Sequence, residues 1–138
     1  MTMMFDTPDD IAFVRACSRK GALSLELKGM KKRGQTAYSI VKEVYGFRGT
    51  RTSVLEDITE FVEAWLRLRK LPPEDYEFAT KATQVQVEYL KELGKFNQPH
   101  FEAIIANGEA DGHITHEQRQ NMSDLFYVSI VRQNAGNR

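Results

Sequence analysis

Two stretches of the chain carry side chains suited to binding a phosphate backbone and reading nucleotide bases. The first is a polar run that comprises Lys31, Lys32, Arg33, Gly34, Gln35 and Thr36. Three consecutive cations beside the start of a helix are typical of a phosphate clamp, because the free N–H groups of a helix also favour anions. We expect phosphate contacts from the cations and supporting contacts from Gln35 and Thr36. The alternative is a charged loop that contacts only solvent.

The second stretch combines arginines with hydroxyl side chains, in the order Arg48, Thr50, Arg51, Thr52 and Ser53. An arginine can bridge two acceptors of a guanine, and hydroxyl groups accept or donate to several base edges. We therefore expect Arg48 to contact phosphate and Arg51 and Thr52 to contact bases, with Thr50 and Ser53 as further candidates.

These side chains are positioned by two predicted helices and the turn between them. Residues 36–45 repeat apolar side chains at helical spacing, and Gly46 and Gly49 bracket a short turn. A longer helix begins at residues 50–53 and ends near residues 68–70. At its start, Ser53 and Glu56 fit a capping box. Two helices joined by so few residues are typical of a helix-turn-helix, whose second helix enters the major groove of DNA by its amino-terminal end.

The segment from residue 34 to residue 65 resembles the amino-terminal DNA-binding domain of plasmid KfrA-type proteins. The matching residues are Gly34, Thr36, Ile40, Val41, Gly46, Gly49, Thr50, Ser53, Leu55 and Trp65. The resemblance implies DNA binding by a plasmid or phage accessory protein or a regulator. It covers roughly a quarter of the chain, lacks the long coiled coil of that family, and has Thr36 and Ala37 where the family usually has a proline.

The distribution of charge supports an anionic partner although the formal net charge of the whole chain is zero. Residues 1–70 hold 13 cationic and 9 acidic side chains, whereas residues 71–138 hold 6 and 10. Between Arg15 and Arg51 there are ten cationic residues and two acidic ones. Such asymmetry between halves is typical of an electrostatic binding face, and the alternative is a basic surface without a partner.

The remaining sequence predicts further helices and no strands, because no window alternates apolar and polar residues. A helix with Thr7 as its N-cap and Pro8 at its first position has a break or bend near Gly21. The residues it carries inward are Ile11, Val14, Cys17 (or Ser18), Leu23, Leu25 and Leu27. Pro72 and Pro73 end the long helix. We expect an all-α fold of five or six helices, with a basic helix-turn-helix-like unit at residues 1–70 and an acidic unit at residues 71–138 that packs or dimerises.

Three helices are expected after the prolines. The first runs from Pro73 to about Lys95 and buries Tyr76 or Phe78 together with Ala82, Val85, Tyr89 and Leu93. A short helix opens at Pro99, and the last runs from Glu117 to about Gln133. Between them, residues 107–118 resemble a degenerate EF-hand loop in which Gln118 replaces the bidentate glutamate. The competing interpretation is a plain connection between helices, with Thr115 and Gln118 as a capping box.

Motifs for enzymatic chemistry are missing from the sequence, which has no Walker loop, no G-x-S-x-G and no H-E-x-x-H. A single cysteine, Cys17, forms no internal disulfide, and no apolar run spans a bilayer. We therefore expect a cytoplasmic, non-enzymatic protein without cofactor, metal or membrane, which binds double-stranded DNA as a homodimer. The alternative is a protein–protein adaptor or inhibitor whose basic patch docks on an acidic partner.

Overall fold

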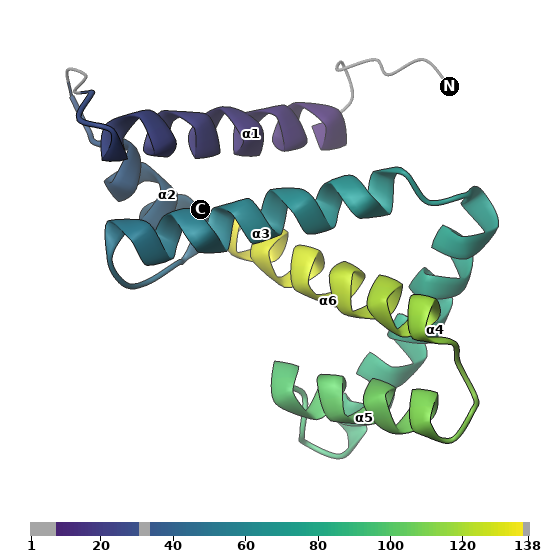
Figure 1. Ribbon diagram of the computed structural model, residues 1–138. Coiled ribbons are helices and arrows are strands. Elements are labelled where there is room, and N and C mark those ends of the chain that lie inside the picture. The colour runs from purple at the N-terminus through teal and green to yellow at the C-terminus, as the bar shows by residue number, and fades with distance from the viewer. Residues whose placement is uncertain (1–7, 31–33, 137–138) are drawn as a thin grey trace. The chain divides into compact units, whose positions relative to one another are not determined.

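The computed structural model describes residues 8–30 and 34–136. Over these residues the chain forms six α-helices and no strands, so the predicted all-α fold is confirmed (Figure 1). The helices are α1 (Pro8–Leu27), α2 (Ala37–Tyr45), α3 (Arg51–Arg69), α4 (Pro73–Glu92), α5 (Gln98–Ala110) and α6 (His116–Gly136). None of the helices in this described part of the chain combines the length and apolarity that crossing a bilayer requires.

The backbone divides into two compact units whose limits fall inside helices. Unit 1 comprises Met1–Glu63 with Val131–Arg138, and unit 2 comprises Ala64–Ile130. The helices α3 and α6 therefore each contribute to both units. The functional division into residues 1–70 and 71–138 follows a different boundary and stays a prediction.

Helix α1 continues through Gly21 without a break, and it buries only part of the predicted stripe. Leu23 is buried as predicted, whereas Ile11 and Val14 are exposed to 38% and 40%. The buried face is completed by Phe13 and Ala16, which the predicted stripe did not include. The predicted cap, Thr7, lies outside the described residues.

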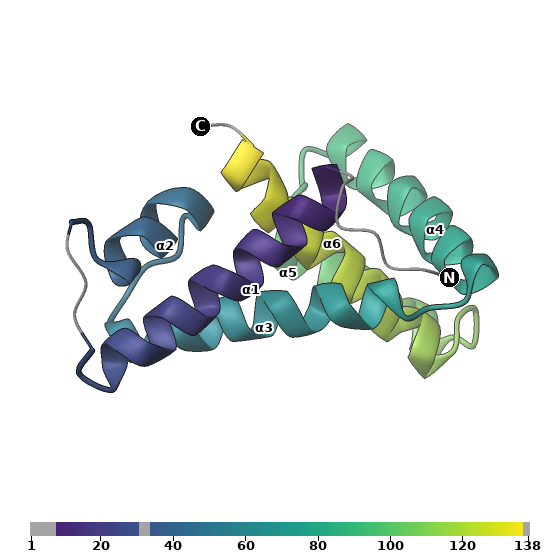
Figure 2. The same ribbon diagram turned by 90° about the horizontal axis from the view of Figure 1, so that it is seen from above.

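Helix α2 begins and ends with strong local signals. The Thr36 hydroxyl accepts the Ser39 backbone N–H at 3.1 Å, as expected of an N-cap. At the other end Gly46 has a φ of 75°, a left-handed conformation that glycine adopts without steric cost, and its N–H donates to the Lys42 carbonyl oxygen. Figures 1 and 2 both place α2 beside the carboxyl-terminal half of α1.

Helix α3 begins earlier than a cap at Ser53 would allow. The cap is Thr50, whose hydroxyl accepts the Ser53 N–H at 3.1 Å, so the predicted capping box of Ser53 and Glu56 is wrong. The preceding residue, Gly49, has a φ of 118°, and a Cβ atom there would lie 3.0 Å from the Ser53 Oγ. The turn therefore brings Thr50 and the first residues of α3 to a fixed position.

The core of unit 1 joins α2 to the amino-terminal part of α3. Val41 and Tyr45 of α2 are buried, and so are Val54, Ile58 and Phe61 of α3. The rings of Tyr45 and Phe61 lie 5.4 Å apart between centroids, a separation at which aromatic rings attract each other. This packing holds the short helix against the one that follows it.

Unit 2 contains α4, α5 and most of α6, and its core is centred on stacked aromatic rings. The rings of Phe101 and Phe126 are 4.1 Å apart and nearly parallel, with Leu90, Ile105 and Met122 buried around them. At the end of α3, the Arg67 guanidinium donates two hydrogen bonds of 2.9 Å to the carboxylate of Asp124. Unlike an exposed ion pair, this one involves a carboxylate that is almost fully buried.

Helix α4 buries a different face from the one predicted from the sequence. Its buried positions are Ala79, Thr83 and Leu90. The predicted inward residues Tyr76, Phe78, Val85, Tyr89 and Leu93 are instead exposed, and Ala82 is partly buried. Leu90 joins the core around Phe101 and Phe126, and Ala82 and Val87 pack against that core from the side.

The connection between α5 and α6 is the plain capped turn rather than a metal-binding loop. Asn107 and Glu109 belong to helix α5, so they do not lie in a loop as the EF-hand template requires. The Thr115 N–H donates to the Gln118 Oε1 at 2.8 Å, and the Gln118 N–H donates to the Thr115 Oγ1 at 3.1 Å. The predicted capping box is thus confirmed. Among the described residues, no group of three or more His, Cys, Asp or Glu side chains is arranged to hold a metal ion.

Candidate nucleic-acid interface

Tyr38, on the first turn of α2, holds the turn between α2 and α3 in place. Its hydroxyl donates to the carbonyl oxygen of Gly49, eleven residues later in the chain. The bond ties the start of one helix to the residue just before the cap of the next. The position of the exposed end of α3 is therefore fixed by a side chain of α2.

Two cations lie over the ring of Tyr38. The Lys42 Nζ is 4.7 Å from the ring centroid and also donates to the Tyr38 hydroxyl at 3.3 Å. The Arg51 guanidinium carbon is 4.8 Å from the same centroid. Both distances are within the range of a cation–π attraction, which draws the positive charges of α2 and α3 toward one point.

The predicted phosphate contact Arg48 and the predicted base-contacting residues 50–53 lie at or just before the amino-terminal end of α3. Arg48, Thr50, Arg51 and Thr52 are exposed, and Ser53 is half-buried. The Thr50 hydroxyl is engaged as the helix cap, so it offers one lone pair fewer to a ligand. Arg48, Arg51 and Thr52 are thus the predicted residues in this turn whose polar groups face solvent without a capping duty.

The predicted contacts at the start of α2 are more strongly engaged within the protein. The carboxylate of Glu26, on α1, accepts the backbone N–H of Ala37 at 2.7 Å and that of Tyr38 at 3.2 Å. A carboxylate therefore occupies the positive end of α2, where a phosphate would otherwise bind. Thr36 is the cap.

Gln35 is also engaged near this end of α2, because its amide donates to Ser39 and to Glu43 at 3.0 Å each. The three cations Lys31, Lys32 and Arg33 lie outside the described residues.

The charge on the solvent-exposed face of α3 changes from positive to negative after the first turn of the helix. Glu56, Glu60 and Glu63 are exposed at spacings of four and three residues, which puts them on one side of the helix. Burial and the neighbouring charge of Glu56 raise the pKa of Asp57, in agreement with a locally acidic surface. A polyanion can approach the first turn of α3 but is repelled by the following turns.

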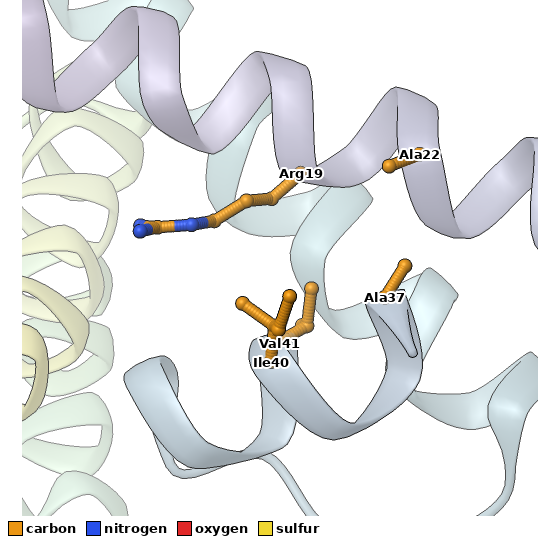
Figure 3. A pocket seen from close by; sticks show the side chains of 5 residues that line it. All are labelled: Arg19, Ala22, Ala37, Ile40 and Val41. Atoms are coloured by element: carbon orange, nitrogen blue, oxygen red, sulfur yellow. The ribbon is translucent and has the colours of Figure 1, made fainter. Parts of the chain in front are cut away.

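A small cavity between α1 and α2 has no room for a nucleotide or a cofactor. It measures about 30 Å³ and is lined by Arg19, Ala22, Ala37, Ile40 and Val41 (Figure 3). This volume corresponds to roughly one or two water molecules. Arg19 is held by Tyr45, whose hydroxyl accepts from its Nη1 at 3.0 Å, so the residue serves to join α1 to α2.

Sequence reasoning missed Tyr38 and Lys42 as members of this site. Their spacing of four residues on one helix indicates that the two side chains meet, and this signal is available from the sequence. The contact between Tyr38 and Arg51 has no such signal, because it depends on how the turn folds back.

The arrangement brings the half-buried Lys42 and the exposed Arg51 over the ring of Tyr38, next to exposed hydroxyl side chains at the start of α3, and such a composition is suited to binding a polyanion. Comparison with known proteins adds no family to this description. No family model, no curated protein and no solved structure matches the chain.

Proposed function

We propose that this protein binds double-stranded DNA through the amino-terminal turn of α3, as a homodimeric regulator or a plasmid or phage accessory factor. The observation that carries the proposal is the pair of cations, Lys42 and Arg51, over the ring of Tyr38, with the exposed Arg48 in the turn just before α3. These side chains surround the exposed start of a helix that follows a short turn. This is the end of the second helix that meets base edges in helix-turn-helix proteins.

The proposed contacts divide between phosphate and base. Arg48 and Lys42 contact the backbone, together with the cations at residues 31–33. Arg51 and Thr52 face the base edges, and Arg51 is the candidate for bidentate contact with guanine. The acidic row that starts at Glu56 limits insertion to about the first turn of α3, because phosphates on either side of the groove repel it.

Tyr38 prepares Arg51 for this role. A guanidinium that lies over an aromatic ring loses side-chain freedom before binding, while the N–H groups at its edge stay available. Less conformational entropy is then lost when the arginine meets a base. Lysine at the same position lacks the planar fork and would not reproduce the contact.

The test is binding of labelled duplex DNA, followed by fluorescence anisotropy at about 50 and about 200 mM salt. We expect micromolar or tighter binding that weakens steeply with salt. Against a selected site, Arg51→Ala should cost about 1–3 kcal/mol and relax the sequence preference, whereas Arg48→Ala should weaken all sequences alike. Lys70→Ala is the matched control, since Lys70 is an exposed cation just after the opposite end of α3.

The results separate the roles of the residues. Equal weakening by Arg51→Ala and Arg48→Ala would contradict base reading by Arg51. A similar loss from Lys70→Ala would show that total charge, rather than this cluster, determines affinity.

The alternative function is docking of the same basic surface on an acidic protein. The observation that favours it is the row Glu56, Glu60 and Glu63, which a partner with both signs of charge would accommodate better than DNA does. Indifference to duplex DNA at the lower salt concentration would favour this alternative. The basic cluster would then be a protein-docking face.

A further inference from the structure

Helix α4 presents a row of large apolar side chains to solvent. Phe78, Val85, Tyr89 and Leu93 are 39%, 60%, 50% and 50% exposed, with the smaller Ala82 between them. The successive spacings of four, three, four and four residues put them on one face of the helix. Contiguous apolar surface of this kind marks an interaction site in a protein that stays in solution. We name this row the outer seam.

Charged residues run along one flank of the outer seam with alternating sign. Glu74, Lys81 and Glu88 are exposed and follow one another at intervals of seven residues, and Lys95 comes seven residues later, just after the helix ends. Residues seven apart lie on the same side of a helix, so the flank reads acidic, basic, acidic, and the exposed Glu92 adds a further acidic residue at the end of the helix. The order of these charges indicates which kind of surface can pair with the outer seam.

We propose that the outer seam is the surface through which two copies of this chain associate, with the two α4 helices antiparallel. Antiparallel helices related by a two-fold axis bring the same flank of each helix together. Lys81 of each copy then faces Glu88 of the other copy. Glu74 of each copy lies near Lys95 of the other, just after the carboxyl-terminal end of α4. The central pair of Lys81 and Glu88 is thus complementary to itself in this direction.

The opposite orientation lacks this complementarity. In a parallel, in-register pair, like residues lie at the same level, so the alternating row contributes no opposite charges. The apolar positions also suit the antiparallel pair, because Phe78 near one end meets the region of Tyr89 near the other and Val85 lies close to the centre. A self-complementary patch of this type produces a closed two-fold dimer rather than a chain of molecules.

The existing contacts of the flank do not oppose this arrangement. Within one chain Lys81 forms an ion pair with Glu77 at 2.8 Å, and Gln84 donates to Glu88 at 3.4 Å. Both side chains of the ion pair are largely exposed, so the pair contributes little stability and can exchange partners at small cost. The proposal gives a surface to the dimer in the proposed function, and it does not depend on DNA binding.

The test is sedimentation equilibrium of the full chain and its variants over a wide range of protein concentration, in buffer without DNA. The wild type should be dimeric, and Val85→Lys should be monomeric because it buries two cations at the centre of the seam. Lys81→Glu and Glu88→Lys should each raise the dissociation constant of the dimer roughly three- to thirtyfold, since each creates two like-charge contacts. The double variant Lys81→Glu with Glu88→Lys should restore wild-type association.

Controls keep these results interpretable. Lys91→Glu has the same charge change on the same helix but lies away from the alternating row, and it should leave association unchanged. Circular dichroism of each variant shows whether it is folded. A wild-type chain that stays monomeric, a dimeric Val85→Lys variant or a double variant without rescue would each overturn the proposal. DNA titration of the same variants is a separate measurement, so failure of DNA binding leaves the dimer result intact.

Discussion

Single carboxylates determine what several parts of this molecule can bind. Glu26 reaches from α1 to the amino-terminal end of α2 and accepts two backbone N–H groups there. The same residue type has a different effect in α3, where Glu56 and Glu60 make the helix acidic beyond its first turn. At the start of α2 and along α3, these carboxylates reduce the surface area that is available to an anion.

Glu109 provides a pH-dependent contribution to stability. The Arg119 Nη1 donates to its carboxylate at 3.0 Å, and this bond, followed by that of His116, lowers the pKa of Glu109 from its ordinary value of 4.5. Because the folded state holds the carboxylate ionised more strongly than the unfolded state does, the contribution is complete above pH 4.5. It is lost as the pH falls below that value, through the lowered pKa.

The measurement is urea denaturation at a series of pH values between neutral and acid. We expect the free energy of unfolding to fall below pH 4.5 less steeply in Glu109→Gln than in the wild type. Arg119→Met removes the main cause of the shift and should have the same effect on the slope. An unchanged slope in both variants would disprove this role of the pair.

At the scale of elements, the ends of α2 and the start of α6 were predicted correctly, whereas the cap of α3 and the buried faces of α1 and α4 were not. Thr36, Gly46 and the pair of Thr115 and Gln118 act through neighbours within a few residues, and local sequence suffices for them. The inward faces of α1 and α4 depend on which distant side chains fill the core first. In α4 the residue in the core with Phe101 and Phe126 is Leu90, and the apolar spacing within α4 favoured the opposite face.

The candidate site follows the same rule. Arg51 and Thr52 were predicted because the end of a helix after a short turn is a local feature. The contact of Arg51 with Tyr38 was not, since thirteen residues and a reversal of the chain separate them.

The glycine that ends α2 gives an element-scale prediction. Gly46→Ala should destabilise the protein by about 1 kcal/mol, because φ is 75° there and only glycine adopts that conformation without cost. A Cβ atom would meet the Asn134 side chain at an ordinary 3.5 Å, so the cost is conformational. Gly21→Ala is the control: it lies inside α1 with open space around it and should stabilise by about 0.5–1 kcal/mol. Thermal melts of both variants check the opposite signs, and equal signs would refute the explanation.

At the scale of the whole molecule, the two compact units share continuous helices. Both α3 and α6 pass from one unit into the other without a break. Unravelling such a helix in one unit removes the turns that support its continuation in the next. We therefore expect the chain to unfold in one cooperative transition.

Two core substitutions test this expectation. Phe61→Ala in unit 1 and Phe101→Ala in unit 2 should each destabilise by about 3–5 kcal/mol, since both rings are fully buried. Trp65, the single tryptophan, lies just inside unit 2 and one helical turn after Phe61, so its fluorescence reports on the boundary between the units within α3. Phe61→Ala should shift the fluorescence transition as far as it shifts circular dichroism. A fluorescence transition that stays at the wild-type midpoint would mean that the units unfold separately.

The carboxylate of Glu26 has a consequence for how the chain distinguishes between anions. Two backbone N–H groups at the start of α2 already donate to the Glu26 carboxylate. A single small anion such as inorganic phosphate therefore has no preformed binding site there. The cations that remain are spread over the surface around Tyr38, and engaging several of them at once requires an anion with many charges along its length. We therefore expect the affinity for an anion to rise with its number of phosphate groups. A single phosphate should bind weakly, whereas a polymer of phosphates should bind more tightly with every additional contact.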